Sequence, residues 1–271
     1  MTIVLFLYGF SVYEWGVLDP TVGKVVTNPE PVHLFPAEVE APVVYFYGEI
    51  PDSVEFTLDC PAKALTETSP AFTRLKGKPG WVLRPLSKNG GEEKSRPSTP
   101  CWDDPEATRF LVGDTPCNYI FYEAEVQFTQ NLYFLPGKEE MTLCNAGRFH
   151  VLDVLCVGSD EAGTMWSAYF PAIQPGETVL VRPGKMLTQV NAESRLLDLG
   201  FTEGAARAFA NQWWPVFTTW PVRKSEESLY MPQGFISLTY RLCPEEIEEI
   251  LPARVSPAPE RFVRAWWVLA R

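Results

Sequence analysis

The sequence lacks the short motifs by which many enzymes are recognised. Its 271 residues contain no glycine-rich phosphate loop, G-x-G-x-x-G, G-x-S-x-G, H-E-x-x-H or EF-hand spacing. Histidine is scarce, with 2 residues, and none of the 6 cysteines forms C-x-x-C, so no zinc site is expected. These absences exclude most motif-bearing hydrolases and nucleotide enzymes, but not a site assembled from distant positions. We predict no cofactor.

Long apolar runs and positive charge are also scarce. No run approaches the ~20 apolar residues of a membrane-spanning helix, so no transmembrane segment is expected. The 23 Lys and Arg residues against 34 Asp and Glu residues give a net charge of −11, which disfavours nucleic acid as a partner. The first residues are apolar up to Phe10, yet they lack a basic segment and an A-x-A site. We interpret them as a buried first strand rather than a removed signal peptide.

Cysteines are too few for a disulfide scaffold. Cys101 and Cys117 flank a loop that is rich in Pro and Asp, which leaves a disulfide between them open. Buried free thiols are the alternative reading.

Proline and aromatic residues are abundant, at 25 Pro and 13% Phe, Trp and Tyr. Short alternating apolar runs between prolines are typical of an all-β chain. We predict a mainly β fold with an N-terminal β-rich domain at 1–118, an antiparallel immunoglobulin-like β-sandwich at 119–190 and a C-terminal α+β region at 191–271 packed on the sandwich. The first and last strands should lie together, because both are apolar and need partners. A strand at 53–60 is expected to pair back on one at 42–50.

One stretch, residues 194–217, has a strong helical pattern. Its apolar stripe includes Phe209 and Trp213, which we expect to be buried. Thr202 stands where the N-cap of this helix belongs. Because Pro215 disfavours helix at the residue before it, we predict that the helix ends near Trp213.

A shorter helix is expected at 192–199, and it should stop at Gly200. A left-handed Gly200 would let Phe201 fold back on Leu196, as in a Schellman motif. Pro244 is expected to open a short acidic helix at its first turn. The region therefore predicts a helix-turn-helix that packs against the β structure.

Five blocks of the sequence are distinctive: VYEWGV (12–17), APVVYFYGE (41–49), YIFYEAE (119–125), AARAFANQWW (205–214) and ILPARVSPAPERFVR (250–264). In the same order, these blocks resemble an uncharacterised family of exported bacterial proteins. The resemblance implies an exported or cell-envelope location and carries no activity. In that family a Glu tends to stand where this chain has Ala205. The turns Asn-Ala-Gly at 145–147 and Pro-Gly-Glu-Thr at 175–178 also resemble those of immunoglobulin-like accessory modules of bacterial surface proteins.

Acidic residues supply the candidate chemistry. Asp103, Asp104 and Glu106 could bind calcium through oxygen ligands, although we favour a solvated acidic turn. Glu123 and Glu125 share one face of a strand and could act as acid and base with Asp103 or Asp104, as in a glycosidase. A polar strand face is the alternative that we favour.

Tryptophans supply the candidate binding surface. Trp102, Trp214 and Trp220 could form a stacking platform for sugars. Trp266 and Trp267 must face opposite sides of a strand, so at least one belongs to the core. Most of the tryptophans are therefore expected to be structural.

The function that we predict is a non-catalytic exported protein, either a binding module or a structural protein that assembles. Self-association or a protein partner would order the polar loop at 87–100 and would use the many aromatic residues. The alternative is a carbohydrate-active enzyme or a carbohydrate-binding domain.

Overall fold

The computed structural model describes residues 9–19, 35–86, 102–135, 141–219 and 234–270. The fold is mainly β, as predicted, with three sheets and three α-helices in these ranges. The largest sheet has nine strands, in the order β15 (Gly184–Lys185), β13 (Met165–Ile173), β12 (Val151–Ser159), β16 (Phe235–Arg241), β18 (Arg261–Ala270), β1 (Phe10–Asp19), β2 (Phe35–Gly48), β9 (Ile120–Phe128) and β4 (Leu65–Ser69).

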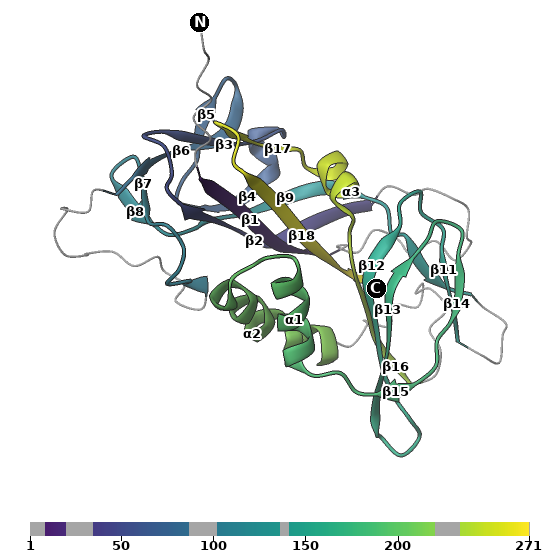
Figure 1. The fold of residues 1–271 in the computed structure, drawn as a ribbon. Helices are drawn as coiled ribbons and strands as arrows, with labels where there is room; N and C mark the ends of the chain where they lie inside the picture. Colours follow the sequence, from purple (N-terminus) through teal and green to yellow (C-terminus); the bar gives the residue numbers. More distant parts are fainter. Residues whose placement is uncertain (1–8, 20–34, 87–101, 136–140, 220–233, 271) are drawn as a thin grey trace, which may run out of the picture.

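Two smaller sheets and the helices complete the fold (Figure 1). One sheet contains β10 (Leu132–Phe134), β11 (Thr142–Asn145) and β14 (Thr178–Leu180). The other contains β17 (Ala253–Ser256), β3 (Val54–Leu58), β6 (Lys78–Pro85), β7 (Phe110–Val112) and β8 (Thr115–Cys117), with β5 (Thr73–Leu75) beside β6. The helices are α1 (Gln189–Asp198), α2 (Glu203–Thr219) and α3 (Pro244–Ile250), with one 3-10 turn η1 (Ala62–Ala64).

The first and last described strands are neighbours, which confirms the prediction. β1 and β18 run parallel from Ser11 opposite Arg261 to Leu18 opposite Val268. The other strand pairs of the described sheets are antiparallel. The β1–β18 pair therefore joins the two ends of the chain within the largest sheet.

The nine-stranded sheet is covered on both faces. One face packs against the smaller sheets and forms what we call the sheet-side core, while the other packs under α1 and α2 and forms the helix-side core (Figure 1). Trp266 belongs to the sheet-side core and its neighbour Trp267 to the helix-side core, as strand alternation predicts. Strands buried on both faces explain why the sequence reads as nearly continuous apolar runs.

The large sheet is continuous across the expected domain boundaries. It takes strands from each of the ranges 1–118, 119–190 and 191–271. Strands of 119–190 are divided between this sheet and the sheet of β10, β11 and β14, whose apolar residues share the sheet-side core. The boundaries at 118/119 and 190/191 thus do not separate hydrogen-bonded units.

The helix hairpin turns at Gly200 and α2 begins after Thr202, as predicted, whereas α1 begins at Gln189, three residues before the expected 192. The Thr202 hydroxyl oxygen accepts a hydrogen bond from the Ala205 N–H at 3.2 Å, so Thr202 caps α2. Gly200 has φ +92°, and the Phe201 N–H donates to the Leu196 carbonyl at 3.1 Å. Both apolar side chains are buried in the helix-side core, which confirms the Schellman stop.

The predicted end of α2 near Trp213 is wrong, because the helix continues through Pro215 to Thr219. Proline removes one N–H from the helix, but the last turn buries Phe217 beneath the hairpin. Thr218 reinforces this turn by donating its hydroxyl to the Trp214 carbonyl at 2.9 Å. Packing therefore outweighs the local preference of the residue before proline.

The predicted pairing of 53–60 with 42–50 is also wrong. β3 pairs with β6 and β17 instead. The alternating apolar side chains of β3 enter the sheet-side core, where the Phe56 ring stacks on Trp81 with centroids 5.6 Å apart. The strand thus covers a face of the large sheet rather than extending it.

Several expectations concern residues outside the described ranges, namely the start of the chain at 1–8, the loop at 87–100, Cys101 and Trp220. Cys117 is a buried free thiol, and burial raises its pKa to about 11. No helix in the described ranges is long and apolar enough to cross a bilayer.

Candidate functional site

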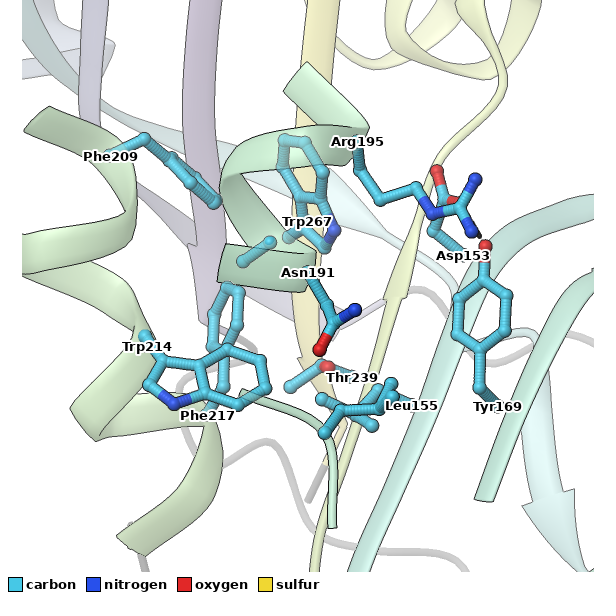
Figure 2. A pocket seen from close by; sticks show the side chains of 12 residues that line it. Asp153, Leu155, Tyr169, Asn191, Arg195, Phe209, Trp214, Phe217, Thr239 and Trp267 are labelled. Carbon is cyan, nitrogen blue, oxygen red and sulfur yellow. Dashed lines mark hydrogen bonds between the residues drawn. The ribbon is translucent and has the colours of Figure 1, made fainter. Parts of the chain in front are cut away.

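A pocket opens between the helix hairpin and the large sheet. The empty space in and in front of the pocket is about 570 Å³, a volume that includes open solvent at its mouth. Figure 2 shows aromatic rings from α2 and β18 at one end and polar side chains from α1, β12 and β13 at the other. The lining residues are Asp153, Leu155, Tyr169, Leu187, Asn191, Ala192, Arg195, Phe209, Trp214, Phe217, Thr239 and Trp267.

Asp153 is held in an unusual backbone conformation at the polar end. The register between β12 and β16 shifts between Leu152 and Leu155, and Asp153 has φ +46°. Asp tolerates this left-handed region better than most residues, although strain remains. A second register shift lies between Val157 and Gly158. A bulge redirects a side chain, and the one at Asp153 brings its carboxylate to the pocket.

Two hydrogen bonds fix the Asp153 carboxylate. The Tyr169 hydroxyl donates to Oδ1 at 2.6 Å, and the Arg241 Nε donates to Oδ2 at 2.7 Å. The Asp153 and Arg241 side chains are only 12% and 10% exposed, so this ion pair is largely shielded from water. Burial, followed by the hydrogen bond to Asp153, raises the pKa of Tyr169 well above its usual value. Tyr169 is therefore a protonated donor at neutral pH.

Arg195 brings a second guanidinium to this end from α1. Its Cζ lies 5.0 Å from the centroid of the Tyr169 ring, in a cation–π contact. The side chain is 47% exposed and forms an i, i+3 pair with Asp198 at 3.5 Å. Such an exposed pair contributes little to stability, so Arg195 remains accessible to another anion.

Asn191 is oriented by the start of α1. Its side-chain Oδ1 accepts a hydrogen bond from the Thr188 N–H at 2.9 Å. The local sequence thus places the first turn of α1 and its polar side chains beside the pocket.

Aromatic side chains form the other end. The Phe209 ring lies 4.5 Å from Trp267 and 5.9 Å from Phe217, measured between centroids. Trp214 is half-buried and lines the pocket, whereas its neighbour Trp213 is buried in the helix-side core, as predicted. Of the three tryptophans proposed for binding, Trp214 is the one that the structure places at a cavity.

Trp102 does not offer a stacking surface, which corrects the expectation. It is 8% exposed, and its ring stacks on Phe121 at 4.8 Å. The Tyr45 hydroxyl donates to the Trp102 carbonyl at 2.8 Å. The loop that looked polar in the sequence is therefore anchored in the helix-side core.

Asp104 is a structural residue rather than an exposed ligand or acid. It is 1% exposed and accepts hydrogen bonds from Tyr47 at 2.7 Å and from Thr202. A Cβ at Gly204 would lie 2.3 Å from the Asp104 Oδ1, so the loop docks tightly on the first turn of α2. Helix N-termini favour such a carboxylate.

The proposed calcium site is not assembled. Asp103 accepts a hydrogen bond from the Asn118 side chain and Glu106 is exposed, while Asp104 is buried. Within the described ranges, no group of three or more His, Cys, Asp or Glu side chains is placed to hold a metal ion.

Glu123 and Glu125 lie on β9, five strands away from β12 in the large sheet. In the backbone register Glu123 stands opposite Glu67 and Glu125 opposite Glu38. Neither residue lines the pocket. The acid pair proposed for a glycosidase is therefore not brought to this cavity.

A second buried ion pair lies in the same sheet. Glu14 accepts hydrogen bonds from Tyr122 at 3.0 Å, from the Trp266 Nε1 at 2.6 Å and from Arg264 at 3.0 Å. The Arg264 guanidinium also donates to the Leu251 carbonyl at 2.7 Å. This network joins the central strands β1 and β18 to β9.

Sequence reasoning missed the residues of both buried pairs. A signal was present, because Asp153 is the one acid of the apolar strand β12 and Glu14 lies in the middle of the apolar strand β1. A charge in a strand buried on both faces requires a partner. The sequence does not show which arginine supplies it, since Arg241 and Arg264 are distant along the chain.

Comparison with protein-family models gives no match, and no curated protein matches the chain.

Proposed function

We propose that the protein is a non-catalytic binding protein that holds a small amphipathic molecule in the pocket beside Asp153. The observation that carries this proposal is the combination of a cavity with a carboxylate in a strained backbone at its polar end, each of whose oxygens accepts a hydrogen bond. Strain of this kind is concentrated at functional sites. Aromatic rings at the opposite end would bury the apolar body of the ligand.

The same contacts support binding rather than catalysis. The Asp153 carboxylate is held by its ion pair with Arg241 and by the Tyr169 hydroxyl. The raised pKa of Tyr169 keeps its proton in place near neutral pH. Both groups are suited to fixing the orientation of a ligand.

Carbohydrate binding is the second candidate. The half-buried Trp214 lies in a pocket that also contains Asn191 and Arg195. An aromatic face beside hydrogen-bonding side chains is the arrangement that a sugar requires. This alternative needs no acid pair.

Ligand-observed NMR tests the proposal with three probes of known chemistry: 4-fluorobenzyl alcohol, 4-fluorobenzoate and methyl β-D-glucopyranoside. We expect a fluorinated probe to bind the parent, and Trp214→Ala to weaken that binding at least about 5-fold through loss of aromatic contact. Val190→Ala is the matched control, because Val190 is exposed on α1 and does not line the pocket. Saturation transfer to the glucoside alone would favour the sugar candidate.

The proposal fails if none of the three probes binds. It also fails if Trp214→Ala and Val190→Ala leave binding equally unchanged, since the probes would then occupy another surface.

Export and self-association are further parts of the proposal. Export is supported by the family resemblance, and burial of Cys117, Cys156 and Cys243 is compatible with an oxidising compartment. Self-association is supported by the abundance of aromatic residues. Secretion of a reporter fusion tests export. Light scattering after gel filtration tests self-association, and a monomer at micromolar concentration would contradict it.

A further inference from the structure

We infer that the polar group of the ligand is a carboxylate, which Arg195 binds while the aromatic end of the pocket holds a flat apolar body. This inference rests on the proposed binding function and names the chemical class of its ligand. Three observations support it: the weak ion pair of Arg195, the hydrogen-bond donors at the polar end, and the position of the Arg195 guanidinium.

Arg195 has the weakest ion pair at the polar end. Asp153 and Arg241 form a largely shielded pair at 2.7 Å. Arg195 pairs with Asp198 at 3.5 Å, and both of these side chains are exposed to water. Because an exposed pair contributes little, a ligand carboxylate could replace Asp198 as the partner of Arg195.

Hydrogen-bond donors outnumber open acceptors at this end. Both Asp153 oxygens already accept a hydrogen bond. The Asn191 Oδ1 is engaged by Thr188, so its amide group can offer N–H donors. Arg195 adds further N–H donors. A carboxylate accepts hydrogen bonds without donating any, and it therefore fits this set better than a hydroxyl does.

The Arg195 guanidinium is already positioned to bind. Its contact with the Tyr169 ring limits the side-chain motion that would otherwise oppose binding. A stacked guanidinium keeps its N–H groups at its edge, where they can bind both oxygens of one carboxylate. Figure 2 shows Arg195 at the opposite end of the pocket from Trp214 and Phe217. A molecule with an aromatic ring and a carboxylate would contact both ends.

Two probes of nearly equal shape test the inference. 4-Fluorobenzoate and 4-fluorobenzyl alcohol differ chiefly in the anionic group, and ¹⁹F NMR gives the affinity of each. We expect the benzoate to bind about 10-fold more tightly, and Arg195→Gln to remove that advantage while changing the affinity of the alcohol less than about 2-fold.

Arg207→Gln is the matched control, because Arg207 is an exposed arginine on α2 that pairs with Glu203 at 3.9 Å and does not line the pocket. Circular dichroism checks that both variants keep the melting temperature of the parent. Selective loss of benzoate binding in Arg195→Gln supports the inference.

Two results would overturn the inference and leave the proposed function standing. One is equal affinity for the alcohol and the benzoate with a shared dependence on Trp214. The other is a preference for the benzoate over the alcohol that Arg195→Gln changes no more than Arg207→Gln does. Failure of both probes and of the glucoside to bind would instead remove the proposed function itself.

Discussion

Ionisation of Glu246 should make the fold less stable as the pH rises. This residue lies in the first turn of α3 and is 6% exposed. Its Oε1 accepts a hydrogen bond from the Asn131 side chain at 2.8 Å, whereas Oε2 is buried and has no hydrogen-bond partner. Burial raises the pKa of Glu246 to about 7, although the Asn131 hydrogen bond and the charge of Arg148 act in the opposite direction.

The magnitude follows from proton linkage. The folded state binds the Glu246 proton more tightly than the unfolded state, in which the pKa of Glu246 is near its ordinary value of 4.5. The contribution of this group to stability is therefore full below pH 4.5 and is lost as the pH rises to about 7. Between pH 5 and pH 8 the loss amounts to about 2.5 kcal/mol, given 1.36 kcal/mol per pKa unit.

Urea denaturation of the parent and of Glu246→Gln at pH 5 and pH 8 measures this effect. Gln is neutral and keeps the oxygen that accepts the hydrogen bond from Asn131. The free energy of unfolding of the variant, relative to that of the parent, should therefore be about 2–3 kcal/mol higher at pH 8 than at pH 5. Glu161→Gln is the control, because Glu161 is exposed in the turn between β12 and β13. If the difference between parent and Glu246→Gln were the same at both pH values, the group would ionise normally and the reasoning would fail.

Three further substitutions test the packing by urea denaturation. Trp213→Ala should destabilise the fold by about 3–5 kcal/mol, because a buried aromatic side chain leaves a cavity, and a change below about 0.5 kcal/mol would contradict this. Glu14→Gln should cost about 3–5 kcal/mol by leaving Arg264 buried with its charge uncompensated, and an effect under about 1 kcal/mol would refute that view of the network. Asp153→Asn tolerates the same backbone conformation but loses the charge that faces Arg241, so we expect the free energy of unfolding to fall by roughly 2–3 kcal/mol. An unchanged free energy of unfolding would show that the ion pair is not stabilising.

The fold class and the helix hairpin were predictable because their signals are local. The N-cap at Thr202 and the stop at Gly200 depend on neighbouring residues, and the structure has both. The end of α2 was missed because Pro215 gives a local signal, whereas burial of Phe217 depends on the sheet beneath the helix. Tertiary packing decided this boundary.

The site could not be read in the same way, because its parts come from distant segments. Trp214 was proposed from the sequence, but Arg195 and Tyr169 gave no signal of their own. The bulge at Asp153 contains no glycine or proline to mark it. The acidic loop was misread for the related reason that Asp104 is buried by side chains far away in the chain. Local composition cannot report such partners.

The two buried ion pairs of the large sheet differ in a way that bears on function. Glu14 sits in a regular parallel pairing with β18, is fully buried and accepts hydrogen bonds from side chains on two other strands, β9 and β18. A charge so enclosed can fix the register of the central strands, and no ligand has access to it. Asp153 makes the same type of bond to Arg241, yet it does so at a bulge, with a left-handed backbone and beside an open pocket. A pair needed only for stability would not require that strain, since the Glu14 pair is made without it. The strain at Asp153 is therefore best explained by the pocket whose polar end it orders.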